Sequence, residues 1–249
     1  MRSECKPGTL RSVLSFVVPA HNEAALIART LAAIQTAAVA AGEPFEVIVV
    51  DDASTDGTAD IAAASGASVV KVELRQIAAV RNAGADAAAG EMLIFVDADT
   101  IVDAAVISAA IAAMRSGAVG GGAEVRFDEP LPRWLKQTLP MWTAIYRALG
   151  YAAGCFVFST RAAFEAVGGF DTRVYAGEEI YLSRALKRHG RFVILRTPVI
   201  SSARKARTHS GREIAGTFLR IALTGSRALR DRRRLDLWYG ARRTDVPRR

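Results

Sequence analysis

The chain has 249 residues, of which 51% are hydrophobic, and its formal net charge is +8. This length and apolar content are sufficient for one domain with a full hydrophobic core. The two cysteines, Cys5 and Cys155, have no spacing suited to a disulfide framework or a zinc site, so we expect a reducing, cytoplasmic location.

The positive charge is concentrated at the C-terminal end. Residues 201–249 contain 14 Lys and Arg against 4 Asp and Glu, whereas the first 200 residues carry a net charge of −2. A segment of this kind binds an anionic membrane surface or phosphate groups, or is simply a solubilising helix. The basic residues lack interleaved aromatics and a nucleic-acid-binding motif, so we expect no nucleic acid partner. The longest charge-free stretches have 13 residues, too few to span a bilayer, so we expect at most peripheral attachment to the inner face of the membrane.

Short β-branched segments alternate with alanine-rich segments, which is typical of βα units and a mainly parallel sheet. We predict strands at 13–18, 46–50, 68–73, 92–96, 118–127 and 154–159. We predict helices at 23–40, 57–65, 77–88, 103–115, 178–189 and 213–230. The helix at 57–65 is expected to start behind Asp56, and the helix at 103–115 behind Thr100 or Asp103.

Polar residues follow three of the predicted strands, where open α/β sheets bind their ligands. PAHNEA follows the first strand, DDASTDGT the second and DADT the fourth. Asp97 and Asp99 stand at i and i+2 of an extended segment, so both face one crevice, and their oxygens suit Mg²⁺ or Mn²⁺ carrying a diphosphate. The alternative for this pair alone is a solvated turn. Together with Asp52, however, these carboxylates would repel one another without a cation or ligand donors.

These segments resemble the glycosyltransferases of family 2. VVPAHNEA resembles the opening strand and loop of that family, EVIVVDDASTDGT its second nucleotide-binding element, AVRNAG its Arg-Asn-x-Gly helix and FVDADT its Asp-x-Asp motif. GCFVFSTRAAFEAVGGFD is similar to the acceptor-side segment, and GEEIYLSRALKRHG to the Glu-Asp helix that supplies the catalytic base. The resemblance implies the α/β GT-A fold, a single Rossmann-like, mainly parallel sheet flanked by helices. It implies a GT-A domain at 1–210, with a donor half at about 13–115 and an acceptor half at about 116–200. The charge distribution adds a basic helical extension at 211–249.

The resemblance also implies which residues bind the donor. Pro19, Ala20 and Glu23 would line the nucleoside pocket, and Asp52 would accept hydrogen bonds from the base. Asp97 would contact ribose or sugar hydroxyls, beside Ala98. The donor-binding set is Pro19, Ala20, Glu23, Asp52, Arg81, Asp97, Ala98 and Asp99.

The cation in this scheme is Mn²⁺ or Mg²⁺. Asp99 would ligate it directly, and His209 would supply a further ligand, as a histidine does in some relatives. Arg81 would lie near the nucleotide; the alternative for Arg81 is a surface cation on its helix.

Inverting transfer needs a carboxylate that removes the proton of the acceptor hydroxyl. Glu178 and Glu179 are the candidates, and the resemblance favours Glu179, because the second position of the family motif is the base. The other glutamate fits the first turn of a helix, where the dipole favours it. Two further groups of residues, one basic and one aromatic, each have two interpretations. Arg204, Lys205 and Arg207 form a lid over the diphosphate or a solvated surface, and Trp134, Trp142 and Tyr146 stack on a sugar or belong to the core.

The sequence therefore predicts a metal-dependent inverting glycosyltransferase. It would move one sugar from a UDP- or GDP-sugar to a hydroxyl on a lipid-linked, small-molecule or glycan acceptor. The Gln-x-x-Arg-Trp element of processive synthases is absent, which favours transfer of a single sugar. The alternatives are a non-catalytic nucleotide-sugar-binding protein that docks on membranes and a sugar-phosphate nucleotidyltransferase, whose Gly-rich opening loop with a nearby lysine is lacking here.

Overall fold

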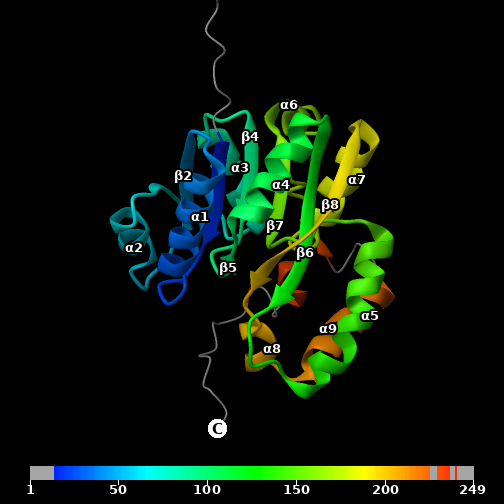
Figure 1. Cartoon of the computed structure of the whole chain (residues 1–249). Helices are drawn as coiled ribbons and strands as arrows, with labels where there is room; N and C mark the ends of the chain where they lie inside the picture. The colour runs from blue at the N-terminus through cyan, green and yellow to red at the C-terminus, as the bar shows by residue number, and fades with distance from the viewer. Residues whose placement is uncertain (1–13, 225–228, 236–238, 240–249) are drawn as a thin grey trace, which may run out of the picture.

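The computed structural model describes residues 14–224, 229–235 and 239. In this part of the chain, eight strands form one mixed sheet with the order β3-β2-β1-β4-β7-β6-β8-β5 (Figure 1). The strands are β1 (Leu14–Ala20), β2 (Phe45–Asp52), β3 (Ser68–Val72), β4 (Met92–Val96), β5 (Thr100–Ile101), β6 (Ala118–Phe127), β7 (Phe156–Thr160) and β8 (Arg191–Ser201).

The first half of the sheet is parallel. β1 pairs in parallel with both β2 and β4, and β2 pairs in parallel with β3. β7 is antiparallel to both of its neighbours, β4 and β6, whereas β8 returns parallel to β6. The predicted mainly parallel sheet is confirmed, and the carboxyl ends of β1, β2 and β4 come together at one edge.

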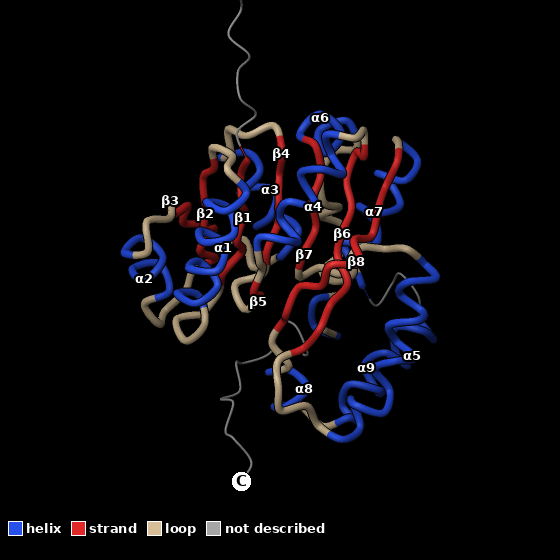
Figure 2. The backbone as a smooth tube through the Cα atoms, in the orientation of Figure 1, coloured by secondary structure: helices blue, strands red, loops and turns tan. Residues whose placement is uncertain are grey.

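Helices cover both faces of the sheet (Figures 1 and 2). They are α1 (Ile27–Ala41), α2 (Thr58–Ala64), α3 (Ile77–Ala87), α4 (Ala104–Arg115), α5 (Arg133–Leu149), α6 (Arg161–Ala166), α7 (Glu178–His189), α8 (Arg204–Thr208), α9 (Gly211–Thr224) and the 3₁₀ turn η1 (Arg232–Arg234). Alternate residues of β1 enter two separate cores: Phe16 packs in the core with α1 and α4, and Val17 in the core with α3 and α7. The strands of this region are buried on both faces, which explains their continuous apolar sequences.

Some predicted boundaries were wrong, and several elements were not predicted. α1 begins at Ile27, not at residue 23, because Asn22 has φ 53° and the Glu23 backbone N–H donates to Thr58 Oγ1 instead of starting a helix. The cap prediction for α4 is confirmed at Asp103, whose side chain accepts from Val106 N at 2.9 Å. The sequence analysis missed β5, α5, α6, β8, α8 and η1. β8 contains Pro198, which lies where its register with β6 shifts, a place where a strand tolerates proline.

The C-terminal part of the described chain packs against the rest. A Cβ on Gly211, at the start of α9, would lie 3.2 Å from the ring of Trp134 on α5, so these two helices are in contact. Among residues 14–224, 229–235 and 239, no helix has both the length and the apolar character needed to cross a bilayer. The predicted helix at 213–230 is seen as α9 up to Thr224; residues 225–228 lie outside the described part. The domain boundary at 210 stays a prediction.

Candidate active site

A cleft of about 810 Å³ opens at the carboxyl ends of β1, β2 and β4. The start of α7 and the helix α8 form other parts of its wall. The residues predicted for the site all line this one cleft: Pro19, Ala20, Glu23, Asp52, Arg81, Asp97, Ala98, Asp99, Glu178, Glu179 and His209. The structure thus brings together side chains that are up to almost 200 positions apart in the sequence. Their individual roles stay predictions.

One end of the cleft is built around Asp52, at the end of β2. Its Oδ1 accepts hydrogen bonds from the backbone N–H groups of Leu74 and Arg75, at 2.7 and 3.0 Å. His21 Nδ1 lies 2.7 Å from the backbone carbonyl oxygen of Asp52. A carbonyl only accepts, so Nδ1 carries the proton, and Nε2 is the acceptor for the Arg75 guanidinium at 3.2 Å. Sequence reasoning missed Arg75, because its place depends on a backbone φ of 53° in a loop.

Arg81 joins the end of β4 to the start of α7. Its guanidinium donates to Glu178 Oε1, and to Asp97 Oδ1 and the Gly154 carbonyl oxygen at 2.8 Å each. Burial alone would lower the pKa of Arg81, but the charges of Asp97 and Glu178 outweigh it and raise that pKa above its ordinary value. Arg81 is only 2% exposed, so its alternative interpretation as a surface cation is wrong.

The position of Arg81 depends on close packing of α3. A Cβ on Gly84, one turn further along this helix, would lie 2.3 Å from Val17 Cγ1 and 2.8 Å from Val50 Cγ2. Glycine therefore allows α3 to approach β1 and β2 closely enough for Arg81 to reach Asp97. This explains the use of the Arg-Asn-x-Gly spacing in terms of geometry.

The two glutamates that begin α7 have different surroundings. Glu178 is buried and bound to Arg81. Glu179 is half-buried, and its Oε2 would lie 3.6 Å from a Cβ on Gly154, in the lining of the cleft. Burial, and then the charge of Glu178, raise the pKa of Glu179 to about 8. A raised pKa means that the protonated form of the Glu179 carboxyl group is favoured at neutral pH.

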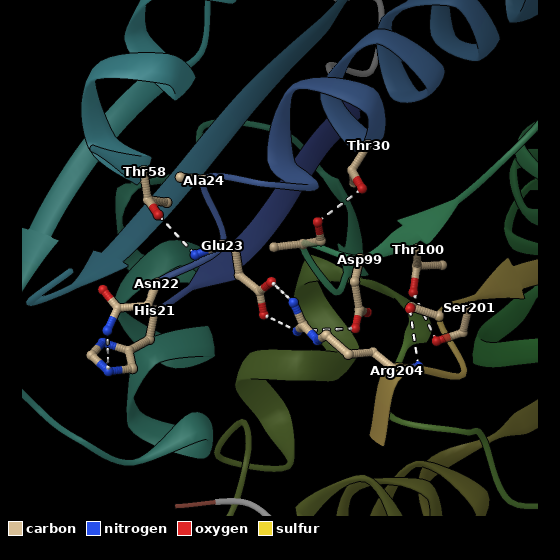
Figure 3. Close-up of polar contacts among 12 residues, drawn as sticks. His21, Asn22, Glu23, Ala24, Thr30, Thr58, Asp99, Thr100, Ser201 and Arg204 are labelled. Carbon is tan, nitrogen blue, oxygen red and sulfur yellow. Dashed lines mark hydrogen bonds and ion pairs between the residues drawn. The ribbon is translucent and has the colours of Figure 1, made fainter. Parts of the chain in front are cut away.

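Asp99 also lines the cleft, and the Arg204 guanidinium lies between its carboxylate and that of Glu23 (Figure 3). Arg204 on α8 donates to both carboxylate oxygens of Glu23 at 2.8 Å, and its Nη2 lies 3.6 Å from Asp99 Oδ2. Burial, and then the charges of Asp97 and Glu23, nevertheless raise the pKa of Asp99 to about 6. Burial and these two carboxylates thus outweigh Lys205 and Arg204, whose positive charges lower the pKa of Asp99.

His209 follows α8 and lines the same cleft. Its Nδ1 lies 3.1 Å from the Lys205 carbonyl oxygen, which can only accept, so Nδ1 carries the proton and Nε2 presents a lone pair, as a metal ligand requires. Within the described residues, no group of three or more His, Cys, Asp and Glu side chains is close enough together to hold a metal ion. The Asp99 carboxylate and the His209 imidazole are each of a type that binds Mn²⁺, and Mg²⁺ and Mn²⁺ in proteins are often held by one or two side chains together with substrate phosphates.

The three basic residues predicted to form a lid separate in the structure. Arg204 and Lys205 line the cleft, whereas Arg207 donates to Asp128 Oδ1 at 2.8 Å and is not part of the lining. The aromatic set separates as well: Tyr146 lines the cleft, Trp134 packs against α9, and the Trp142 side chain lies outside the description.

Three residues of the predicted basic extension line the cleft: Leu229, Arg232 and Tyr239. The Tyr239 hydroxyl donates to the Tyr175 carbonyl oxygen at 2.7 Å and accepts from Ile77 N at 3.4 Å, at the start of α3. The Arg232 guanidinium carbon lies 5.1 Å from the centroid of the Tyr239 ring. No local pattern signals these contacts, because they join positions far apart in the sequence.

The model of Glycosyl transferase family 2 matches residues 15–168, more than half of the chain. The chain belongs to this family. Among curated family relatives, validoxylamine A glucosyltransferase of Streptomyces hygroscopicus subsp. jinggangensis is 35% identical over 117 residues, which cover 43% of this chain and 27% of that protein. Undecaprenyl-phosphate 4-deoxy-4-formamido-L-arabinose transferase of Pseudomonas aeruginosa is 30% identical over 162 residues, 60% of this chain and 47% of that one. The chain thus spans less than half the length of either relative.

Solved structures show the same fold. The mannosyltransferase PcManGT of Pyrobaculum calidifontis, in complex with GDP-Man and Mn²⁺, superposes with a TM-score of 0.66 at 22% identity, over 90% of this chain and 66% of that one. Residues 1–349 of TarS from S. aureus, in complex with UDP-GlcNAc, give a TM-score of 0.60 at 20% identity, over 76% of this chain and 58% of that one. The GT-A-like α/β fold predicted for this family 2 chain is confirmed.

Proposed function

We propose that the chain is a metal-dependent inverting glycosyltransferase that moves one sugar from a nucleoside-diphosphate sugar to a hydroxyl acceptor. The observation that carries the proposal is the meeting, in one cleft, of the Asp97 and Asp99 pair with a half-buried carboxyl group, Glu179, whose pKa is raised to about 8. Membership of family 2 and relatives named as glucosyl and arabinose transferases support it.

The donor would lie along the carboxyl edge of the sheet. Asp52 would accept hydrogen bonds from the base, in a pocket lined by Pro19 and Ala20, and Asp97 would contact ribose or sugar hydroxyls. Arg204 and Lys205 would face the diphosphate, since a guanidinium forms paired hydrogen bonds with phosphate oxygens. The solved neighbours contain GDP-Man and UDP-GlcNAc, so both uridine and guanosine donors belong in the test.

Asp99 and the Nε2 of His209 would hold Mn²⁺ or Mg²⁺. The bound cation would neutralise charge on the leaving diphosphate. Because Arg204 already lies beside Asp99, part of that neutralisation is supplied by the chain itself.

Glu179 would act as the base. Its carboxylate would take the proton of the acceptor hydroxyl while that oxygen forms a bond to the anomeric carbon, and the bond from this carbon to the diphosphate oxygen breaks on the opposite face. The configuration of the sugar is inverted. Arg81 would be a positioning residue: it holds Glu178 away from this role and fixes the start of α7 against Asp97.

Release of nucleoside diphosphate from a panel of UDP- and GDP-sugars, with and without Mn²⁺ or Mg²⁺, tests the proposal. We expect metal-dependent release that Asp99→Ala abolishes and that Asp86→Ala, a change of an exposed aspartate on α3, leaves intact. Tight donor binding without release, given any of the lipid-linked, small-molecule or glycan acceptors, would support a non-catalytic binding protein. Release unchanged in Asp99→Ala would contradict the assigned site.

A further inference from the structure

The end of α5 exposes large apolar side chains. Of the large hydrophobic residues exposed in the described part of the chain, three lie in the last three turns of this helix: Met141 is 54% exposed, Tyr146 39% and Leu149 51%. The others are Val39 in α1, Leu74 in the loop between β3 and α3, and Ile200 in β8. Scattered apolar residues are ordinary on a surface, whereas a group on one helix marks an interaction site.

The first part of α5 is covered by a neighbouring helix. The helix α9 lies beside α5 (Figure 2). Trp134 packs against Gly211 at the start of α9, and Leu135 is buried. Met141 and Leu149 are eight residues apart, which separates them by about 12 Å along the helix and about 80° around it, so they share one exposed strip. Tyr146 of the same helix lines the cleft. The exposed strip therefore borders the entrance to the candidate active site.

Basic side chains of α7 flank this strip. Lys187 Nζ donates to the Leu149 carbonyl oxygen at 2.8 Å, and Arg184 Nε donates to the Tyr151 hydroxyl at 3.0 Å. Both cations also lie against the Tyr151 ring, at 4.7 and 5.2 Å from its centroid. Both hydrogen bonds are to neutral acceptors, so neither cancels the positive charge of its donor. We call Met141, Leu149, Tyr151, Arg184 and Lys187 the basic-apolar face.

We propose that the basic-apolar face docks on an anionic phospholipid bilayer. Apolar side chains on one side of a helix enter the headgroup boundary, and Lys and Arg beside them bind anionic headgroups. A second copy of the chain fits this face less well, because a two-fold contact would place Arg184 and Lys187 near their own copies and add like-charge repulsion. This site is separate from the basic residues beyond 210 and lies beside the cleft.

Co-sedimentation of the full chain with phosphatidylcholine vesicles, with and without phosphatidylglycerol, tests the proposal. Leu149→Glu should lower binding to the anionic vesicles about tenfold, as expected if about half the burial of one leucine side chain is lost. Val39→Glu is the matched control: it makes the same change at a 69% exposed residue near the end of α1 and should bind like the unaltered chain.

Three results would overturn the proposal. The first is equal loss, or no loss, of binding in Leu149→Glu and Val39→Glu. The second is equal binding to neutral and anionic vesicles. The third is a dimer in light scattering that Leu149→Glu separates into monomers, which would make this face a contact between copies. Nucleoside diphosphate affinity, measured on the same samples, should be unchanged in both variants, because neither residue lines the cleft.

Discussion

Glu179→Gln should make the protein more stable at alkaline pH and should also remove the proposed catalytic base. The pKa of Glu179 is about 8 in the folded chain against an ordinary value of 4.5, because burial and the charge of Glu178 disfavour its ionised form. The folded state therefore holds this proton more tightly than the unfolded state does. The stability that the group contributes is fully present below pH 4.5 and is lost as the pH rises through about 8.

The size of the effect follows from the two pKa values. A pKa raised from 4.5 to about 8 corresponds to a loss of about 5 kcal/mol of folding free energy across that range. Glutamine has the same shape and does not ionise. The free energy of unfolding of Glu179→Gln should therefore exceed that of the unaltered chain by about 2–5 kcal/mol more at pH 9 than at pH 4. The same substitution should lower transfer by about 10²–10⁴-fold, the usual contribution of a general base.

Glu178→Gln is the control and should lower the free energy of unfolding instead of raising it. Glu178 neutralises Arg81, which is 2% exposed, and removing one partner of a buried ion pair costs about 3 kcal/mol when other partners persist. Urea unfolding of both variants and the unaltered chain at pH 5, 7 and 9 provides the measurement. Equal stability of Glu179→Gln and the unaltered chain at every pH would refute the reasoning, and stabilisation by Glu178→Gln instead would reverse the two assignments.

Three further predictions concern the same cleft. As Glu179 ionises among Glu178, Arg81, Asp97 and Tyr146, kcat/KM should rise about tenfold per pH unit up to a pH of about 8 and should then level off. A flat profile from pH 6 to 9 would exclude Glu179 as the base. Arg204→Ala should weaken nucleoside diphosphate binding by about tenfold or more. Arg207→Ala should leave this binding unchanged, because the Arg207 guanidinium pairs with Asp128. If calorimetry gave the two variants the same affinity, Arg204 would not belong to the site. Tyr239→Phe should lower the free energy of unfolding by about 1 kcal/mol and speed hydrogen exchange at the Ile77 amide. The reason is that the Ile77 amide and the Tyr175 carbonyl each lose their hydrogen bond to the Tyr239 hydroxyl. Unchanged exchange would show that this contact is not formed.

The sheet was predictable where strands are buried on both faces. β1, β2 and β4 have continuous apolar sequences between polar loops, so their positions and parallel pairing follow from the pattern. β8 was not predictable in the same way, because Arg196 and Pro198 interrupt it, and it exists through its pairing with β6. The two-residue β5 likewise depends on its partner β8.

The site was predictable where its residues end strands or begin a helix. Asp52, Asp97 and Asp99 line one cleft because parallel strands end at one edge of the sheet. The contacts that Arg81 makes with Asp97 and Glu178 could not be predicted, because they depend on how closely Gly84 allows α3 to approach the sheet. The arrival of Arg232 and Tyr239 in the cleft likewise depends on the tertiary path of the chain after α9.

Calorimetric titration of UDP and GDP in the presence of Mn²⁺ tests the central claim most directly, because it separates donor binding from catalysis. The proposed arrangement predicts that one of these nucleotides binds, that Asp99→Ala loses this binding, and that Glu179→Gln retains it. Binding of neither nucleotide, or binding that survives Asp99→Ala, would contradict a donor site at the carboxyl ends of β1, β2 and β4.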